Sequence, residues 1–378
     1  MSYRSALLAT TMAALLVACG GEKKPEGEAA APAAPAPEEK VLNVYNWSDY
    51  IAEDTVPTFS KDTGIKVNYD VFDSNEVLET KLLAGRTGYD VVVPSASFLE
   101  RQIKAGVFLK LDKSKLPNLK NMDPEIMQRV ALHDPNNEHS IPYMWGTTGI
   151  GYDVDKVKKA LGTDKVDSWA IVFDPKNAAK LKDCGITMLD APSEVIDSAL
   201  IYLGKDPNSE SEADLKAAEE LLMKVRPYVR SFNSSAYIDS LANGDICVAI
   251  GWSGDVLQAR DRAKEAGKGV TVAYSIPKEG AIMWFDMLAI PADAAHPDNA
   301  YQFINYLMDP KVVAAASNVI SYANGNLASL EFVDPAVKGD PAVYPDAAVK
   351  AKLHPHLAES QEFSRLMNRS WTRFTTGQ

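Results

Sequence analysis

Four short segments of the chain hold aromatic, acidic or hydroxyl side chains that together could bind an organic cation. They are Trp47–Tyr50, Pro94–Ser95, Trp252–Asp255 and Met283–Asp286. Carboxylates form charge-assisted hydrogen bonds with ammonium groups. Tryptophan and tyrosine rings cover methylene groups and attract cations by about 0.5–2 kcal/mol each. Because a buried cation without such partners costs several kcal/mol, the pattern favours a ligand with cationic ends and an aliphatic middle, such as a polyamine.

These segments lie beside predicted strands. Val41–Tyr45 precedes the first, while the short apolar runs Tyr89–Val93 and Ile246–Gly251 precede the second and third and are typical of strands buried on both faces. The fourth opens the predicted strand Met283–Ile290. Ligands of doubly wound sheets bind outside the carboxyl ends of the strands. Each residue alone has an ordinary alternative, since tryptophans usually belong to the core and acids near strand ends often cap turns or helices.

Strands and helices alternate along the first part of the chain. Glu53–Thr63 is a predicted helix, and two capping boxes, Asp73 with Glu76 and Ser97 with Glu100, predict the starts of two more. Alternation of this kind indicates an α/β fold with a parallel, doubly wound sheet.

The length and the glycine pattern predict two lobes. The glycine-containing segment Ile141–Tyr152 suits a strand that bends as it crosses between lobes. We assign residues 41–148 to the first part of lobe 1 and 149–278 to lobe 2. We assign 279–378 to a return into lobe 1 with C-terminal helices packed near the hinge. A hinged pair of lobes can close on a ligand.

The N-terminus predicts export and a lipid anchor. Arg4 precedes an apolar run, Ala6–Val17, that is too short to span a bilayer. The run ends at Cys19 in a sequence that resembles a bacterial lipobox, so we expect residues 1–18 to be a lipoprotein signal peptide. Residues 19–40 are rich in Pro, Ala and Glu, and we expect them to form a tether. The alternative is an ordinary signal peptide that contains a cysteine.

Composition limits the other possibilities. The net charge of −12 argues against nucleic acid and is compatible with a cationic ligand. Cys184 and Cys247 are a single pair in an exported chain, which favours a disulfide over two buried thiols. The five histidines show no recognisable metal spacing, and Gly251–Gly254 is one residue too short for a nucleophile elbow. We therefore expect no metal, no cofactor and no catalysis.

Several longer runs resemble the periplasmic putrescine-binding proteins of ABC importers. They stand in the family's order from near Val41 toward the C-terminus: Val44–Ile51, Val71–Asn75, Val93–Arg101, Pro142–Gly151, Leu241–Trp252 and Ser275–Gly280. The resemblance implies a two-lobed periplasmic binding protein fold of type II, a ligand in the interlobe cleft, and pairing of Cys184 with Cys247. It also implies a monomer that delivers a polyamine to an ABC permease and contacts the membrane only through its anchor.

The resemblance also implies a ligand site. Its residues in this chain are Trp47, Ser48, Asp49, Tyr50, Ser95, Glu194, Ser234, Trp252, Asp255, Trp284, Asp286 and Tyr322. Asp255 would bind one ammonium end, and Asp49 and Asp286, with Ser48, the other. The five aromatic rings would enclose the chain, with Glu194 reaching the ligand directly or through water.

One residue departs from the putrescine pattern. At the position of Trp284, putrescine receptors of this family often carry Phe, whereas spermidine-preferring relatives favour Trp. Ser97 and Ala191, in contrast, match the putrescine type. These residues together favour spermidine only slightly, and either polyamine stays open as the ligand. A polyamine sensor in the same fold and a hydrolase using Asp255 and Asp286 are the alternative functions.

Overall fold

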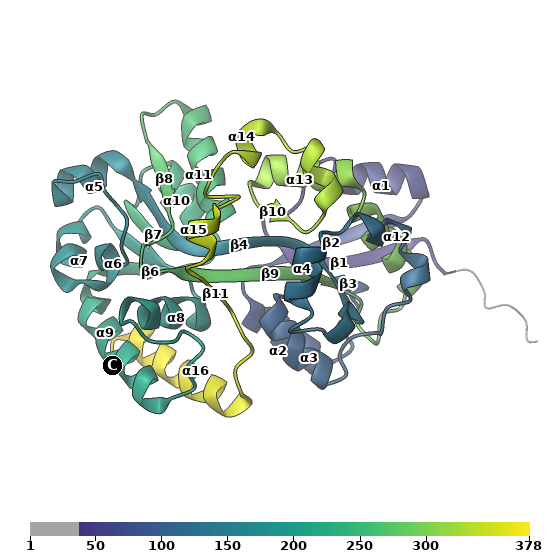
Figure 1. Cartoon of the computed structure of the whole chain (residues 1–378), viewed down its shortest axis with the longest axis horizontal. Helices are drawn as coiled ribbons and strands as arrows, with labels where there is room; N and C mark the ends of the chain where they lie inside the picture. Colours follow the sequence, from purple (N-terminus) through teal and green to yellow (C-terminus); the bar gives the residue numbers. More distant parts are fainter. Residues whose placement is uncertain (1–37) are drawn as a thin grey trace, which may run out of the picture. The chain divides into compact units, whose positions relative to one another are not determined.

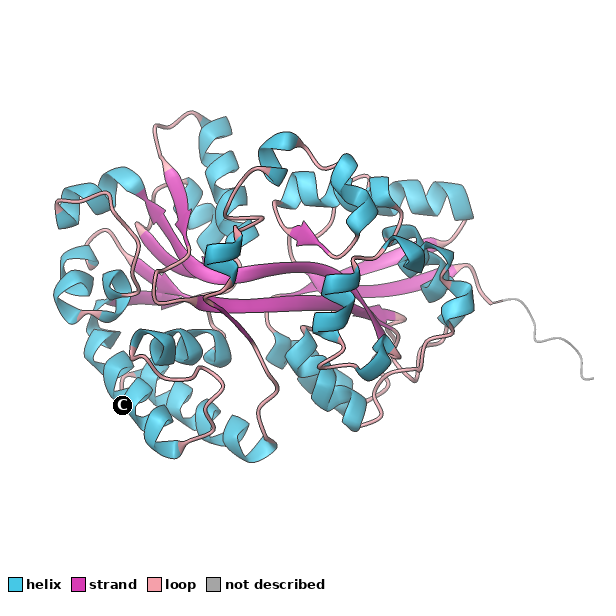
Figure 2. Cartoon of the chain, viewed as in Figure 1, coloured by secondary structure: helices cyan, strands magenta, loops and turns pink. Residues whose placement is uncertain are grey.

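The structure is a computed structural model that describes residues 38–378 (Figure 1). The predicted signal peptide, Cys19 and most of the tether lie outside the described residues. No helix within residues 38–378 is long and apolar enough to cross a membrane. Helices lie on both sides of a central sheet (Figure 2).

Eight strands follow one another across this sheet. In spatial order they are β2 (Lys66–Phe72), β1 (Val41–Trp47), β3 (Val91–Val92), β9 (Ala281–Ala289), β4 (Ser140–Asp153), β7 (Val248–Trp252), β5 (Ile186–Met188) and β6 (Val229–Phe232). Three short strands pair at its sides: β8 (Val272–Ser275) and β10 (Ala323–Asn324) with β4, and β11 (Leu353–Pro355) with β9.

The sheet is mixed, with a parallel part at each end. Strands β1, β2 and β3 are parallel to one another, and so are β5, β6 and β7. Strands β4 and β9 run antiparallel to each other, and to β7 and β3 respectively. The predicted mostly parallel sheets are confirmed at the two ends, and the long strands β4 and β9 join them (Figure 1).

The predicted helix Glu53–Thr63 is confirmed as α1, which begins at Thr55. The bounds of the helices are α1 Thr55–Thr63, α2 Asn75–Ala84, α3 Ala96–Lys104, α4 Pro124–Val130, α5 Val154–Leu161, α6 Ala170–Phe173, α7 Pro175–Leu181, α8 Pro192–Tyr202, α9 Glu212–Val225, α10 Tyr237–Ala242, α11 Ser253–Ala266, α12 Pro297–Leu307, α13 Pro310–Ile320, α14 Pro335–Lys338, α15 Ala347–Lys350 and α16 Gln361–Thr376.

Both predicted capping boxes are wrong in detail. Ser74, not Asp73, caps α2, because Ser74 has an extended backbone and its side chain accepts a hydrogen bond from the N–H of Val77. Helix α3 begins after Ser95, two residues before the predicted cap at Ser97. The Ser95 hydroxyl donates to Asp286 and makes no cap bond.

The predicted strand Ile141–Tyr152 is confirmed as β4. Its glycine at position 146 is needed for packing, since a Cβ there would lie 2.8 Å from the ring of Trp284 on β9. The disulfide between Cys184 and Cys247 is present, with the Cα atoms 5.4 Å apart. It links the segments that lead into β5 and β7. The structure therefore contains the predicted disulfide and not the alternative of two buried thiols.

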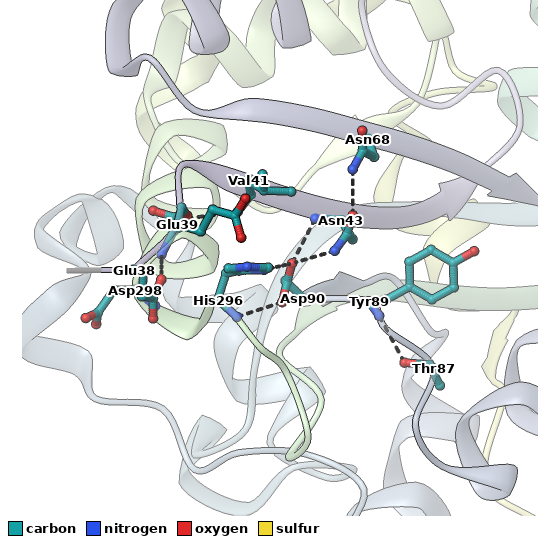
Figure 3. Close-up of polar contacts among 11 residues, drawn as sticks. Glu38, Glu39, Val41, Asn43, Asn68, Thr87, Tyr89, Asp90, His296 and Asp298 are labelled. Atoms are coloured by element: carbon teal, nitrogen blue, oxygen red, sulfur yellow. Dashed lines mark hydrogen bonds and ion pairs between the residues drawn. The ribbon is translucent and has the colours of Figure 1, made fainter. Parts of the chain in front are cut away.

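The two ends of the described chain are both held by the fold. The Glu38 carboxylate accepts hydrogen bonds from the N–H groups of Asp298 and Asn299, at 2.9 and 3.0 Å, at the start of α12 (Figure 3). Beside it, fully buried Asp90 accepts from the N–H groups of Asn43 and His296. At the other end α16 packs on α8 and α9 rather than on the central strands (Figure 1).

Candidate functional site

The structure brings every predicted ligand residue except Asp49 to one pocket of about 440 Å³, which we call the main pocket. Its walls are Trp47, Ser48, Tyr50, Ser95, Glu194, Ser234, Trp252, Asp255, Trp284, Asp286 and Tyr322, together with Asp73, Asn75 and Ile238.

Strand ends and helix starts place these side chains. Trp47 ends β1, Trp252 ends β7, and Asp255 lies in the first turn of α11. Trp284 and Asp286 are two residues apart on β9, so both point to the same face of the sheet. The pocket therefore receives residues from both parallel parts of the sheet and from a strand that joins them.

Asp255 is held by two tyrosine hydroxyls. Tyr322 donates to Oδ1 at 2.7 Å and Tyr237 donates to Oδ2 at 2.9 Å. Asp255 is only 6% exposed, and burial raises its pKa to about 7, although the two hydroxyls lower it. A carboxylate that accepts only neutral donors still lacks a positive partner.

Asp286 has a similar environment built from other elements. Tyr50 donates to Oδ2 at 2.7 Å and Ser95 to Oδ1 at 2.5 Å, while Asn75 orients the Ser95 hydroxyl. Burial raises the pKa of Asp286 to about 7, and the charges of Glu194 and Asp255 add to this effect. Within residues 38–378, neither Asp255 nor Asp286 forms an ion pair with a lysine or arginine, so a cationic ligand would supply the missing charge.

Aromatic rings line the space between these carboxylates. Trp47 and Trp252 meet edge to face with ring centres 5.5 Å apart, and Tyr322 contacts Tyr50 at 5.1 Å and Trp284 at 5.5 Å. Edge-to-face packing leaves ring faces available to the pocket and fixes their orientation. Such walls can cover an aliphatic chain.

Trp284 and Glu194 are linked through Thr148, a residue that the sequence analysis missed. The indole N–H of Trp284 donates to Thr148 Oγ1 at 3.2 Å, and the Thr148 hydroxyl donates to Glu194 Oε2 at 2.5 Å. The buried indole N–H of Trp284 therefore has a hydrogen-bond partner within the protein. Thr148 lies in the run Pro142–Gly151 that carried the family resemblance, but nothing in its residue type indicated contact with the site.

Asp49 departs from the prediction. It has a left-handed backbone, with φ of 53°, and its carboxylate pairs with Arg262 of α11 at 2.7 Å instead of entering the pocket. Arg262 also pairs with Asp239 of α10 at 2.9 Å. The arginine already neutralises Asp49, so the structure provides no reason to assign an ammonium group to it.

The other residues that sequence reasoning missed complete the walls. Asp73, Asn75 and Ile238 line the pocket, and Tyr237 supports Asp255 from outside it. Asp73 and Asn75 belong to the quoted run Val71–Asn75, which was a usable signal. Tyr237 lies 18 positions before Asp255, and only the packing of α10 on α11 brings the two together.

Comparison with known proteins identifies the family. The family described as bacterial extracellular solute-binding protein matches residues 54–345. The chain belongs to this family. As a solute-binding protein it has the two-lobed α/β fold that the sequence resemblance implied.

Individual relatives of this solute-binding protein are similar over almost their whole length. The putrescine-binding periplasmic protein PotF of Escherichia coli is 58% identical, over 90% of this chain and 93% of that protein. The putrescine-binding periplasmic protein SpuD of Pseudomonas aeruginosa is 56% identical, over 91% and 94%. The crystal structure of the spermidine/putrescine ABC transporter substrate-binding protein PotD of Streptococcus pneumoniae has a TM-score of 0.72 and 27% identity, and covers 90% of this chain and 99% of that one.

Proposed function

We propose that this chain is a periplasmic receptor that captures a polyamine in the main pocket and delivers it to an ABC permease. One observation carries the proposal. Two buried carboxylates, Asp255 and Asp286, accept from hydroxyl donors, have no basic partner within the part of the chain that the structure describes, and are separated by aromatic walls. The names of the relatives agree with this chemistry.

In this proposal each carboxylate binds one ammonium end. Asp255, held by Tyr237 and Tyr322, takes one end, and Asp286, held by Tyr50 and Ser95, takes the other. The rings of Trp47, Trp252, Trp284 and Tyr322 cover the methylene groups between the two ends. A diammonium ligand would favour the ionised form of both acids and so lower the pKa that burial raises.

We propose that residues 41–148 with 279–360 form one lobe, that residues 149–278 form the other, and that the lobes close on the ligand. Helix α16 belongs to the second lobe in this proposal because it packs on α8 and α9, which corrects the assignment of all of residues 279–378 to the first lobe. Three contacts across this division support a closed state: Trp47 with Trp252, the Ser48 and Ser235 hydroxyls at 3.2 Å, and Asp49 with Arg262. Release to the permease would require these contacts to separate.

We further propose that lipidated Cys19 anchors the protein to a membrane and that residues 19–40 act as a tether for a monomeric body. The lipobox-like sequence supports the anchor. The disulfide between Cys184 and Cys247 is consistent with an oxidising compartment such as the periplasm.

Putrescine is our first candidate ligand, because the two most similar relatives named above bind it. Spermidine is the second candidate, because Trp284 gives the pocket a wall of the shape found in spermidine-preferring relatives. The bond from Trp284 to Thr148 shows that the indole is accommodated without help from a ligand.

Calorimetry tests the proposal. The full-length protein is titrated with putrescine, cadaverine, spermidine, spermine and agmatine in separate runs. We expect micromolar or tighter binding of at least one of them, about −8 kcal/mol or better. Absence of binding across the panel would contradict the assignment. A permease and an ATPase encoded beside the gene would support transport over sensing.

A further inference from the structure

A second hollow lies outside the main pocket, between the α8–α9 loop and the segment that leads into α16. We call it the side groove. Its volume is about 530 Å³, and it is lined by the acids Asp197, Glu210 and Glu359 and by the apolar side chains Leu357, Phe363 and Met367, among others.

Asp197, at one wall of the side groove, is a buried carboxylate without a hydrogen bond. It is 4% exposed, and no N–H or O–H group within residues 38–378 donates to it. The nearest basic atom is His356 Nε2 at 3.9 Å, which is too far for a hydrogen bond, and this nitrogen is itself buried without a partner. Burial raises the pKa of Asp197 well above its usual range, and the charges of Glu359 and Glu194 raise it further.

The other acids of the side groove already have partners. Glu210 accepts from the N–H and the hydroxyl of Ser360, at 2.5 and 2.7 Å. Glu359 accepts from the Ser364 hydroxyl and lies 3.6 Å from an Arg101 guanidinium nitrogen. Asp197 therefore stands out among its neighbours. Burial without a hydrogen bond favours the protonated form of Asp197, and a cation beside it would favour the ionised form. A purely structural role is therefore a poor explanation for this residue.

The position of Asp197 separates it from the main pocket. It lies on α8 three residues after Glu194, so the two carboxylates are neighbours on one face of the helix. Glu194 lines the main pocket, however, whereas Asp197 lines the side groove. Glu194 and Asp197 are thus one helical turn apart but line different hollows.

We propose that the side groove is a second cation site, in which Asp197 binds the primary ammonium group of an aliphatic amine and Leu357, Phe363 and Met367 cover its hydrocarbon chain. Two sources of this group fit the same chemistry. It is either a separate amine molecule or the far end of a polyamine too long for the main pocket.

A variant without the main-pocket carboxylates isolates the side groove. We would titrate full-length Asp255→Ala/Asp286→Ala protein with n-butylammonium and follow the ligand by saturation-transfer NMR, after checking the fold by circular dichroism. We expect binding with a Kd of about 1 mM. Adding Asp197→Asn should weaken it at least about tenfold. The control Glu212→Gln, which removes an exposed carboxylate at the start of α9, should leave it unchanged.

Two results would overturn the proposal: no butylammonium signal in the pocket-deficient protein, or an equal signal with and without Asp197→Asn. Because this test omits the main-pocket carboxylates, it does not depend on the proposed polyamine function. If the calorimetric panel shows no binding but butylammonium binds, the side-groove proposal is retained and the polyamine proposal is rejected. If the panel shows binding but butylammonium does not bind, only the side-groove proposal is rejected.

A stability measurement keeps the proposal testable if weak binding is hard to detect. Asn is the neutral equivalent of Asp in shape, so Asp197→Asn should raise the Tm of the unliganded wild-type protein by a few degrees at pH 8. A fall in Tm would show that the Asp197 charge supports the fold, and would contradict a site kept for a cation.

The two sources give different results with long ligands. If the far end of a polyamine occupies the side groove, Asp197→Asn weakens spermine binding to the otherwise wild-type protein and leaves putrescine binding unchanged. If a separate amine binds, neither main-pocket affinity changes, and only the butylammonium site is lost. Both results require an Asp197-dependent site.

Discussion

Asp255 and Asp49 show how two aspartates with the same predicted role differ once their surroundings are known. Asp255 is 6% exposed and accepts from two tyrosine hydroxyls, and no lysine or arginine among residues 38–378 forms an ion pair with it. The Asp49 side chain is 40% exposed and pairs with Arg262. A carboxylate that the protein has left without a counter-charge is prepared for a cationic ligand, and one that is already paired is not. The role of a carboxylate in a binding site thus depends on whether a basic side chain already pairs with it.

The largest effect should come from Asp255→Ala. Truncating one partner of a buried, hydrogen-bonded charge pair costs about 2–5 kcal/mol, so putrescine affinity should fall at least about 30-fold in calorimetry. Asp49→Ala is the control and should lose no more than a few-fold. Equal losses in the two variants would remove the distinction between these aspartates.

The pH dependence should be the next largest effect. Burial raises the pKa of both Asp255 and Asp286 to about 7, above the usual value of 3.8. The folded, unliganded protein therefore binds more protons than the unfolded chain between about pH 4 and 7, and its stability falls as pH rises through that range. A diammonium ligand needs the ionised acids, so affinity should weaken below pH 7 by up to about tenfold per unit for each carboxyl.

This effect can be measured as the ligand-induced rise in Tm between pH 5 and 8. The rise should increase with pH and level off above about 7. The same measurement on Asp255→Asn/Asp286→Asn protein should show a small rise with little dependence on pH. A wild-type curve as flat as that of the double variant would contradict the assigned roles.

Thr148→Val should have an intermediate effect. The substitution keeps the shape of the side chain but leaves the Trp284 indole N–H and the Glu194 carboxylate without their shared partner. The free energy of unfolding should fall by about 1–3 kcal/mol in denaturant titrations. In a Trp284→Phe background the same change should cost less, because one of the two orphaned groups is already absent.

The smallest effect should come from the Asp49–Arg262 pair at the rim of the division between lobes. Arg262→Gln should raise the putrescine dissociation rate about two- to fivefold, as expected for a part-exposed ion pair worth about 0.2–1 kcal/mol. Because Asp49 and Arg262 share one interaction, the double variant Asp49→Asn/Arg262→Gln should dissociate no faster than Arg262→Gln alone. If the effects of the two substitutions add, the pair does not hold the lobes together.

The sequence predicted those parts of the fold and site that depend on local spacing. The apolar runs predicted β1, β3 and β7, and the glycine-containing segment Ile141–Tyr152 predicted the long strand β4. The sequence could not predict the caps of α2 and α3, because several adjacent residues can serve as a cap and only packing selects one. Ser95 stands at the N-cap position of α3, but its hydroxyl donates to Asp286, 191 positions away, instead of capping the helix.

The sequence also could not predict the partners of the charged groups. Arg262 lies 213 positions after Asp49, and no local pattern announces that the two will meet. Tyr237 and Thr148 look like ordinary core residues in the sequence. The resemblance to a family identified which residues line the pocket, while the structure was needed to show which of them lack a counter-charge.

The contact between Trp47 and Trp252 has a practical consequence. Two indoles with centres 5.5 Å apart and planes inclined by 75° are close enough for their electronic transitions to interact. The near-ultraviolet circular dichroism of the protein should therefore contain a signal that exists only while these two rings touch. The chain has six tryptophans, and the spectrum of Trp252→Phe subtracted from that of the wild type would isolate this signal. The protein thus contains its own optical gauge of opening and closing, readable without any attached dye.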